Sequence, residues 1–399
     1  MKNNIITKFL ITLSVPTIAV LGHALNITVI VTAIYIPLLF ILSLFSNKHG
    51  HLMKSTPLKL YILFFLLSLL SVFNAIDTTV FLDTVKTQVG CVIFGLAMFN
   101  FILINPVYIK YFFFSCILTT YFFALYLFNS GALDMKLEDD LDTRISDENF
   151  NANVFPYYIF LASFSFFFLF HLLKFKILKY LYFFSLPLYL YIILSSGSRG
   201  GLIIFILIQI LYWFYIGTGQ VQSYFKSTMK LLTALILSLP VLGYTVTLMM
   251  DETNIGKRFG ALSEEGEGTI RVVLAKLAFE KFLEYPFLGV GTGNFLLHNK
   301  YHLFSHNNFM EILVNNGIFT FIIYVSTFVV IVQKALAFKK KTNDTDLTKH
   351  ADIIILFVLG FSLYSVFYVF VNVIAFTGFI FSIFALLYII DYNVDCKRV

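Results

Sequence analysis

The feature that most constrains this chain is a succession of apolar stretches, each long enough to cross a lipid bilayer. A membrane-spanning helix needs about 20 mostly apolar residues. Only 13% of the residues are charged and 59% are hydrophobic, whereas a soluble domain carries about 25% charged residues. The sequence therefore predicts an all-α polytopic membrane protein with about twelve transmembrane helices, in which residues 1–399 form a single membrane domain. The stretches are 9–22, 25–45, 57–73, 89–105, 107–128, 154–173, 180–197, 201–217, 231–250, 318–333, 352–371 and 373–391.

Basic residues sort to one side of this arrangement. If the spans alternate in direction, both termini share a side, and the positive-inside rule makes the lysine-rich side cytoplasmic. Because the net charge of +6 follows this sorting, it indicates no nucleic-acid partner. The first apolar stretch has no clear small-residue cleavage site, so we expect it to stay as a span. Of the 28 lysines and arginines, 18 fall on the side of the termini: Lys2, Lys8, Lys48, Lys54, Lys59, Lys110, Lys174, Lys176, Lys179, Lys226, Lys230, Lys334, Lys339, Lys340, Lys341, Lys349, Lys397 and Arg398.

Two long loops, 129–153 and 251–308, fall on the opposite, outer side. The first is acidic, but its spacing matches no calcium loop, and a solvated face is the simpler interpretation. The cysteines Cys91, Cys116 and Cys396 fit neither a disulfide framework nor a metal-ligand spacing. The sequence therefore predicts no metal site.

Arg199 is the first of two outer-side arginines that suggest anion binding. It lies beside glycines at the start of the stretch 201–217. A helix N-terminus binds anions, an arginine there adds a bidentate fork for phosphate, and the glycines let a ligand approach the backbone. An interfacial arginine that reaches lipid phosphates fits this segment equally well.

Arg271 is the second, in an amphipathic helix predicted over Ile270–Glu284. In the first helical turn the macrodipole disfavours a cation, so we expect an anionic partner there; a surface pair with Glu267 is the alternative. A glycine-rich tight turn, 289–293, follows. Lys86, expected in a short outer loop before the fourth span, is a weaker third cation, and a loop lysine without a role is the simpler interpretation.

His306 precedes a short helical pattern beside the membrane. Asn308 and Glu311 have the spacing of a capping box, Asn307, Glu311 and Asn315 form a polar stripe at every fourth position, and Gly317 suits a helix stop. The helix dipole disfavours a positive charge at this place, so we expect a neutral, proton-accepting imidazole. A loop histidine without a function is the alternative.

Together these residues resemble the O-antigen ligase/polymerase superfamily of bacterial envelope enzymes. The resemblance covers roughly residues 185–330, including the loop 251–308, and extends from Arg199-Gly200 through Arg271 to His306-Asn307, with Gly317 and Thr320 as motif support. It implies a bacterial inner-membrane protein with a large periplasmic loop containing short amphipathic helices.

The resemblance also implies an activity that needs no metal or nucleotide cofactor. A glycan would pass from an undecaprenyl-diphosphate carrier to a sugar hydroxyl of lipid A–core at the periplasmic face. His306 would be the catalytic base, and the substrate-binding residues would be Arg199, Arg271, Lys86 and Asn307.

Two other functions stay open at this point. A polymerase of O-antigen or capsule repeat units uses the same donor but a second lipid-linked glycan as acceptor. A transporter or flippase would be expected to carry ionisable residues in mid-span, whereas nearly all of those in this sequence lie at span ends or in loops.

Overall fold

The computed structural model describes residues 5–24, 30–45, 54–129, 154–196, 198–216, 267–342 and 344–396. Within these ranges the chain forms helices and no β-strand, which confirms the predicted all-α class. The helices up to the middle of the chain are α1 (Ile5–Thr12), α2 (Ser14–Ala19), η1 (Val20–Ala24), η2 (Val31–Tyr35), α4 (Ile36–Leu44), α5 (Thr56–Leu69), η4 (Leu70–Asn74), α6 (Thr78–Ile104) and α7 (Tyr108–Asn129). They are followed by α8 (Val154–Leu173), α9 (Lys176–Ser195), α10 (Arg199–Leu211), η5 (Tyr212–Ile216), α13 (Glu267–Glu284), η6 (Asn294–His298), α14 (Asn308–Lys341), α15 (Thr345–Tyr364) and α16 (Ile374–Cys396).

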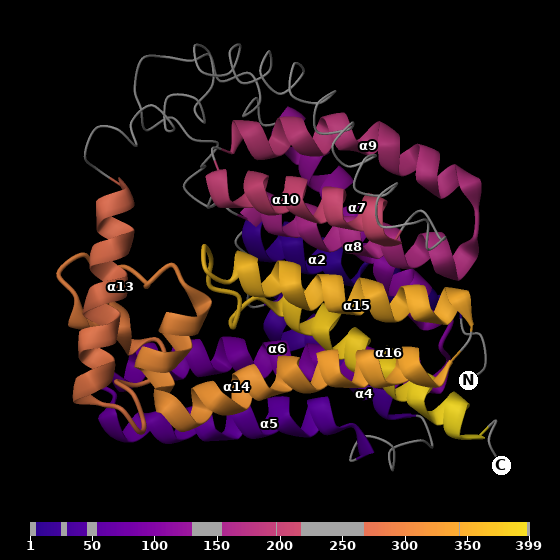
Figure 1. The fold of residues 1–399 in the computed structure, drawn as a ribbon. Helices are drawn as coiled ribbons and strands as arrows, with labels where there is room; N and C mark the ends of the chain where they lie inside the picture. Colours follow the sequence, from indigo (N-terminus) through magenta and orange to yellow (C-terminus); the bar gives the residue numbers. More distant parts are fainter. Residues whose placement is uncertain are drawn as a thin grey trace.

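The long helices lie side by side in a bundle (Figure 1), with α8 in its interior. Every residue of α8 from Val154 to Phe170 is buried. Its neighbours are α7, α9, α10 and α15, while α6 packs on α16 and α14 packs on α5. Phenylalanines fill much of the space between helices, for example Phe113 stacked on Phe168 with ring centroids 5.0 Å apart.

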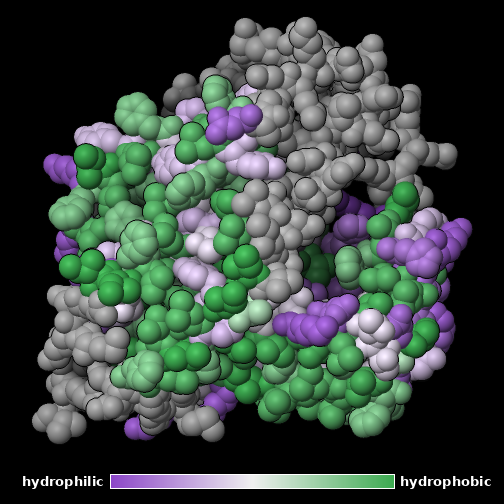
Figure 2. All heavy atoms as spheres, turned by 180° about the vertical axis from the view of Figure 1, so that it is seen from behind, coloured by the Kyte–Doolittle hydropathy of each residue, from purple (hydrophilic) through white to green (hydrophobic). Residues whose placement is uncertain are grey.

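Other phenylalanines and aliphatic residues cover the outside of the bundle, among them Phe184, Ile177 and Phe73. Figure 2 shows hydrophobic side chains across much of the visible flank. Such a surface is unfavourable in water and favourable against lipid tails, so the bundle has the exterior of a membrane domain.

The number of spans agrees only in part with the prediction. Eight helices in the described ranges are long and apolar enough to cross a membrane, or nine if the bent pair Ile5–Thr12 and Ser14–Gly22 is one span. Two shorter apolar helices, Val31–Leu44 and Arg199–Phe214, occupy the predicted stretches 25–45 and 201–217. The stretch 231–250 lies outside the described residues. The count of twelve therefore stays a prediction.

One predicted span ends early. The apolar stretch 352–371 was expected to be helical throughout, but α15 ends at Tyr364 and residues 365–373 form a turn. Hydropathy alone missed this end because the turn is itself apolar and satisfies its backbone groups with a side chain from another helix, described below.

The helix α13 stands across one end of the bundle, the end at which α14 begins (Figure 1). This confirms the predicted helix, although it begins at Glu267 instead of Ile270. Its inner face forms a small separate core with the loop that follows and with α14, made of Leu274, Ala278, Val290, Phe295 and Val314.

Candidate functional site

The site is built around a break in α14. Gly317 has φ +76° and ψ 178°, so the helix is interrupted there and resumes at once. A positive φ is costly for any residue with a Cβ, and a Cβ at this position would lie 2.1 Å from the carbonyl oxygen of Phe287. The helix stop predicted at Gly317 is thus confirmed as a kink, with nine residues of helix, 308–316, before it.

The loop 285–293 lies directly against this kink. Val290 and Gly291 donate their backbone N–H groups to the carbonyls of Val314 and Asn315 at 2.9 and 3.0 Å. These are carbonyls that the break in α14 would otherwise leave without a backbone donor. Gly289, with φ +71°, allows the close approach, since a Cβ there would lie 2.3 Å from the carbonyl carbon of Asn315. The tight turn predicted for the glycine-rich segment is therefore confirmed.

A buried polar cluster joins the kink to the end of α5, where the carbonyl of Ser68 accepts from the hydroxyl of Thr292 at 3.2 Å, and to Ser71 of η4. The Nδ2 of Asn316 donates to the hydroxyl of Thr292 at 2.5 Å, and the hydroxyl oxygens of Thr292 and Ser71 lie 3.0 Å apart. The backbone N–H of Thr292 donates to Ser71 Oγ at 2.9 Å. Buried polar groups are costly unless they are paired, so this cluster fixes the loop, the kink and α5 relative to one another.

His306 lies just before α14 in an unusual backbone conformation. Its φ is +56°, in the left-handed region that non-glycine residues rarely adopt, and its side chain is half-buried. The next residue, Asn307, is the N-cap, whose Oδ1 accepts from the N–H groups of Phe309 and Met310 at 3.0 and 3.1 Å. The imidazole is therefore presented by a fixed turn at the start of a helix.

The predicted capping box at Asn308 and Glu311 is wrong. Asn307 is the cap, because the side chain of Asn308 points elsewhere: its Oδ1 accepts from the backbone N–H groups of Phe370 and Val371 at 2.8 and 3.0 Å. Its Nδ2 donates to the hydroxyl of Tyr324 at 2.8 Å. Asn308 thus supplies the acceptor that holds the turn 365–373 in place.

Glu311 is buried, with 3% of its surface exposed. Its Oε2 accepts from the backbone N–H of Ser305 and its Oε1 from Nδ2 of Asn315, both at 2.8 Å. The predicted polar stripe on this helix is therefore real, but it faces inward and supports the loop that carries His306.

Arg199 is the first residue of α10, as the sequence predicted, and is half-buried. Ser198 caps the helix by accepting from the N–H of Gly201 at 3.3 Å. The adjacent glycines serve packing: a Cβ on Gly200 would lie 2.9 Å from Cβ of Phe367, in the turn 365–373. Asn308 and the start of α10 therefore contact the same turn, which brings the segments of Arg199 and His306 to one end of the bundle.

Arg271 is exposed on α13. Because the helix begins at Glu267, Arg271 is its fifth residue and lies beyond the first turn. The predicted first-turn position is therefore wrong, and because the dipole effect decays within that turn, it does not call for an anionic partner at Arg271. Figure 1 nevertheless places α13 at the end of the bundle where α14 begins.

Lys86 was expected in a loop, and this is wrong. Asp77 accepts from the N–H groups of Thr79 and Val80 at 2.7 and 3.3 Å and so starts α6 at Thr78. Lys86 lies well inside this helix, with its ammonium 2.8 Å from the carboxylate of Asp83. Nothing in these contacts directs Lys86 toward His306.

Two other histidines lie close in sequence. His302 is exposed and also left-handed, with φ +50°. His298, in η6, is half-buried with its ring centroid 6.3 Å from that of Tyr285. Burial and the nearby Lys281 lower the pKa of His298, while Glu284 acts weakly in the opposite direction. The imidazole of His298 therefore favours its neutral, proton-accepting form, but His298 belongs to the loop packed under α13.

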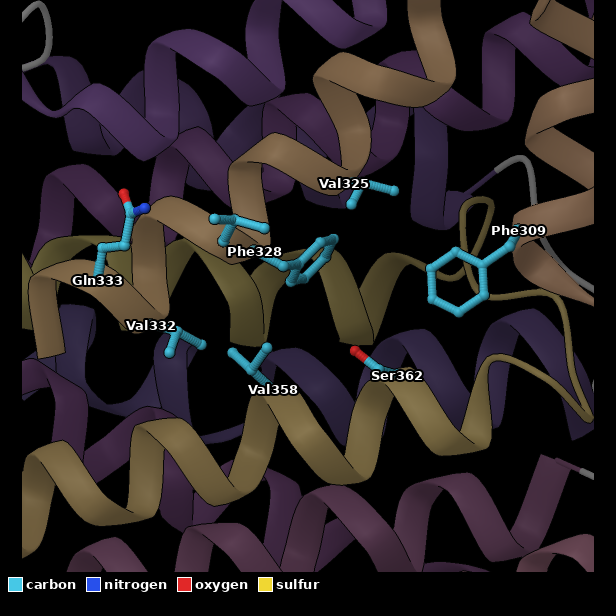
Figure 3. A pocket seen from close by; sticks show the side chains of 8 residues that line it. Phe309, Val325, Phe328, Val332, Gln333, Val358 and Ser362 are labelled. Carbon is cyan, nitrogen blue, oxygen red and sulfur yellow. The ribbon is translucent and has the colours of Figure 1, made fainter. Parts of the chain in front are cut away.

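An apolar groove of about 300 Å³ runs along α14 and α15. It is lined by Phe309, Val325, Phe328, Val329, Val332, Gln333, Val358 and Ser362. Figure 3 shows the side chains of α14 facing Val358 and Ser362 of α15. Phe309 is three residues from His306, so one end of the groove lies near the histidine, and the other reaches Gln333, far along the helix.

A second, polar cavity has about 10 Å³ of space, enough for roughly one water molecule. Glu311 lines it together with uncharged polar side chains: Thr84, Gln88, Thr292, Asn315, Asn316 and Asn372. In the described part of the chain, no group of three or more histidine, cysteine, aspartate or glutamate residues is arranged to hold a metal ion.

Comparison with known families identifies this region. Residues 184–325 match the model of a family described as O-antigen ligase. This match supports the O-antigen ligase/polymerase superfamily for residues 184–325. No curated protein matches the chain. The matched region agrees with the resemblance at residues 185–330 and contains Arg199, Arg271, His306 and Gly317, with Thr320 buried one turn beyond the kink. Members of this superfamily are glycosyltransferase-like enzymes that act on polyprenyl-linked glycans.

Several residues that shape the site were missed or misassigned in the sequence. The sequence predicts a capping role for Glu311, places Thr292 only in the glycine-rich turn and Asn316 only in the helix stop, and predicts nothing for Ser71. In the sequence these residues are polar side chains at the ends of apolar stretches, where a side chain is normally expected to face water. Only the fold shows that Ser71 faces Thr292 and Asn316, because it lies more than 200 residues from both in the sequence.

Proposed function

We propose that this chain is an O-antigen ligase, which transfers a glycan from an undecaprenyl-diphosphate carrier to a sugar hydroxyl of lipid A–core at the periplasmic face. The observation that carries the proposal is the family match over 184–325. It contains both arginines and His306, and α10, α13 and α14, which carry or follow these residues, all begin at one end of the bundle (Figure 1).

The residues suit a direct displacement. His306 accepts the proton of the acceptor hydroxyl as the hydroxyl oxygen attacks the anomeric carbon. The bond from that carbon to the phosphate oxygen breaks, and the polyprenyl diphosphate leaves with the electron pair. Arg199 and Arg271 stabilise the negative charge that develops on the leaving group. One displacement inverts the anomeric centre.

The groove between α14 and α15 supports a lipid-linked donor. Its lining is apolar apart from Gln333 and Ser362, and it begins at Phe309, beside the His306 segment. A polyprenyl tail in this groove would gain the burial energy of apolar surface. Its diphosphate would then lie at the same end as His306 and the start of α10.

The test uses the purified chain in nanodiscs with lipid-linked glycan as donor. We expect His306→Ala to lower turnover by about 10²–10⁴-fold with donor binding retained, and His302→Ala and His298→Ala to cost much less. Offering lipid A–core and a second lipid-linked glycan in separate reactions distinguishes ligase from polymerase. Transfer only to the second lipid-linked glycan would show that the chain is a polymerase and not a ligase. Full activity of His306→Ala would refute the proposal that His306 is the catalytic base.

A further inference from the structure

The segment that carries His306 is tied to α14 by one carboxylate. Glu311 accepts from the backbone N–H of Ser305, the residue just before His306, at 2.8 Å. Its other oxygen accepts from Asn315 Nδ2 at 2.8 Å. Asn315 in turn accepts, through Oδ1, from the backbone N–H of Phe295 at 2.9 Å. A single chain of hydrogen bonds thus joins the His306 turn, the first turns of α14 and the loop under α13.

The backbone of His306 needs such support. A left-handed φ of +56° costs a residue with a Cβ free energy, and this conformation persists only where the surroundings over-determine it. On one side of His306, Asn307 is fixed as the helix cap. On the other side, Ser305 is held by Glu311. The hydroxyl of Ser305 also donates to the carbonyl of Asn307 at 3.0 Å and closes the turn, and the carboxylate of Glu311 anchors this closed turn to α14.

The chemistry of the contact requires a carboxylate. Two N–H donors, from Ser305 and Asn315, point at the two oxygens of Glu311. A glutamine would offer one acceptor and one donor. Asn315 cannot turn its oxygen toward that donor without abandoning the N–H of Phe295. In either orientation a buried N–H loses its acceptor, which is costly.

We propose that Glu311 is a positioning residue, whose carboxylate fixes the Ser305–His306 turn and thereby places the His306 imidazole against the acceptor hydroxyl. This role rests on the proposed function of His306. Glu311 itself takes no proton from the substrate; it acts through the backbone of Ser305. Because misplacement of a catalytic group by about 1 Å can cost on the order of 10²-fold, loss of the anchor lowers turnover more than it lowers donor affinity.

The decisive experiment exchanges donor and acceptor between the two side chains. In Glu311→Gln the chain of hydrogen bonds is broken, and in Asn315→Asp two carboxylates face each other. When both substitutions are combined, the new amide at position 311 accepts from the N–H of Ser305 through its oxygen and donates through its nitrogen to the new carboxylate at position 315. The second oxygen of that carboxylate accepts from the N–H of Phe295, so the backbone N–H groups of Ser305 and Phe295 both have acceptors again.

We expect kcat to fall by about 10–100-fold in each single variant, with the KM for donor nearly unchanged. In the double variant kcat should return to within a few-fold of the wild-type value. A double variant as slow as either single variant would overturn the proposed chain of hydrogen bonds as the cause of the loss.

A second arm separates positioning from mere stability. In the His306→Ala background, Glu311→Gln should lower the residual transfer no further, because there is no imidazole left to position. The matched control is Glu284→Gln on α13, an exposed carboxylate paired with Lys281, which should leave kcat unchanged. A loss from Glu311→Gln that is as large without His306 as with it would overturn the positioning role.

A third arm does not depend on activity. Hydrogen exchange followed by mass spectrometry on a peptide that covers residues 303–307 should show about tenfold faster exchange in Glu311→Gln and recovery in the double variant. Unchanged exchange would refute the hydrogen bond itself. Wild-type protein without any transfer from the lipid-linked donor would refute the proposed function, and the positioning role with it, while exchange would still decide whether Glu311 holds the turn.

Discussion

The two arginines proposed to bind the diphosphate differ in their surroundings, and so they suit different contacts with it. Arg199 is half-buried at the first position of α10, where the helix N-terminus favours an anion beside it. Arg271 is exposed on α13, beyond the first turn. Arg199 is therefore the better placed of the two for a fixed phosphate contact, and Arg271 for an anion that arrives from outside the bundle.

We expect Arg199→Ala and Arg271→Ala each to abolish detectable transfer, a loss of at least about 10²-fold, with normal protein levels. Lysine at either position should restore only part of the activity, because it keeps the charge and loses the bidentate fork. Turnover of the purified variants with lipid-linked donor measures this. Lys276→Ala, which removes an exposed cation from the same helix as Arg271, is the control and should transfer normally. Near-normal transfer by both alanine variants would refute the proposal that these arginines stabilise the diphosphate leaving group.

For single residues, the sequence indicated which side chains belong to the candidate site, but not which atoms they contact. The motif residues His306, Asn307 and Gly317 follow from spacing along the chain, and the structure gives Asn307 and Gly317 clear local roles as cap and kink. The role of Glu311 did not follow, because its two partners include a backbone N–H six residues earlier in an irregular loop. Periodicity carries no information about such a loop.

At the scale of elements, the site depends on a helix that is broken and re-joined. The loop 285–293 donates to the carbonyls freed at the kink, and Ile318, just after it, donates its N–H to the carbonyl of Pro286 at 2.9 Å. The loop and the kink therefore complete each other's backbone hydrogen bonds. Neither has a complete set alone, so we expect them to form together.

Gly317→Ala tests this pairing. The substitution forces a Cβ to within 2.1 Å of the Phe287 carbonyl oxygen at a positive φ, which should cost on the order of 1–3 kcal/mol and displace the loop. We expect a clearly lower Tm in detergent and a loss of transfer. Gly90→Ala, inside α6 with open space around the new Cβ, is the matched control and should be neutral or slightly stabilising. Equal Tm values for the two variants would contradict the packing described for the kink.

The sequence predicted that a helix exists wherever an apolar run is long, but it did not predict where each helix begins and ends. α6 begins eleven residues before the predicted 89 because Asp77 caps it, and α15 ends at Tyr364 although the apolar run continues to 371. In the second case the chain turns because Asn308, on another helix, accepts from the N–H groups of Phe370 and Val371. An end fixed by a partner 62 residues away leaves no mark in local hydropathy.

At the scale of the whole molecule, the two ends of the bundle differ in chemistry. One end carries the uncharged polar cluster, the kink and α13 (Figure 1). Toward the other end of α14 lie ion pairs that join neighbouring helices. Lys334 pairs with Asp391 of α16 at 2.7 Å, and Lys339 pairs with Asp352 of α15. These lysines belong to the set whose sorting predicted the cytoplasmic side, and the structure groups them away from the site.

Membrane orientation can be tested with one cysteine at each end. Lys300→Cys lies in the loop before His306, and Lys340→Cys lies in the last turn of α14; both positions are exposed. Cys91 and Cys116 are buried and are replaced by serine together with Cys396, so that each variant carries one thiol.

In intact cells a membrane-impermeant maleimide should label position 300 and leave position 340 unlabelled until the membrane is opened. This follows from the positive-inside rule applied to Lys334, Lys339, Lys340 and Lys341. The reverse pattern would place His306 on the cytoplasmic face, where a periplasmic acceptor cannot reach it, and would refute the orientation and the proposed ligase together. Equal labelling of both positions in intact cells would instead refute the assignment of α14 as a complete span.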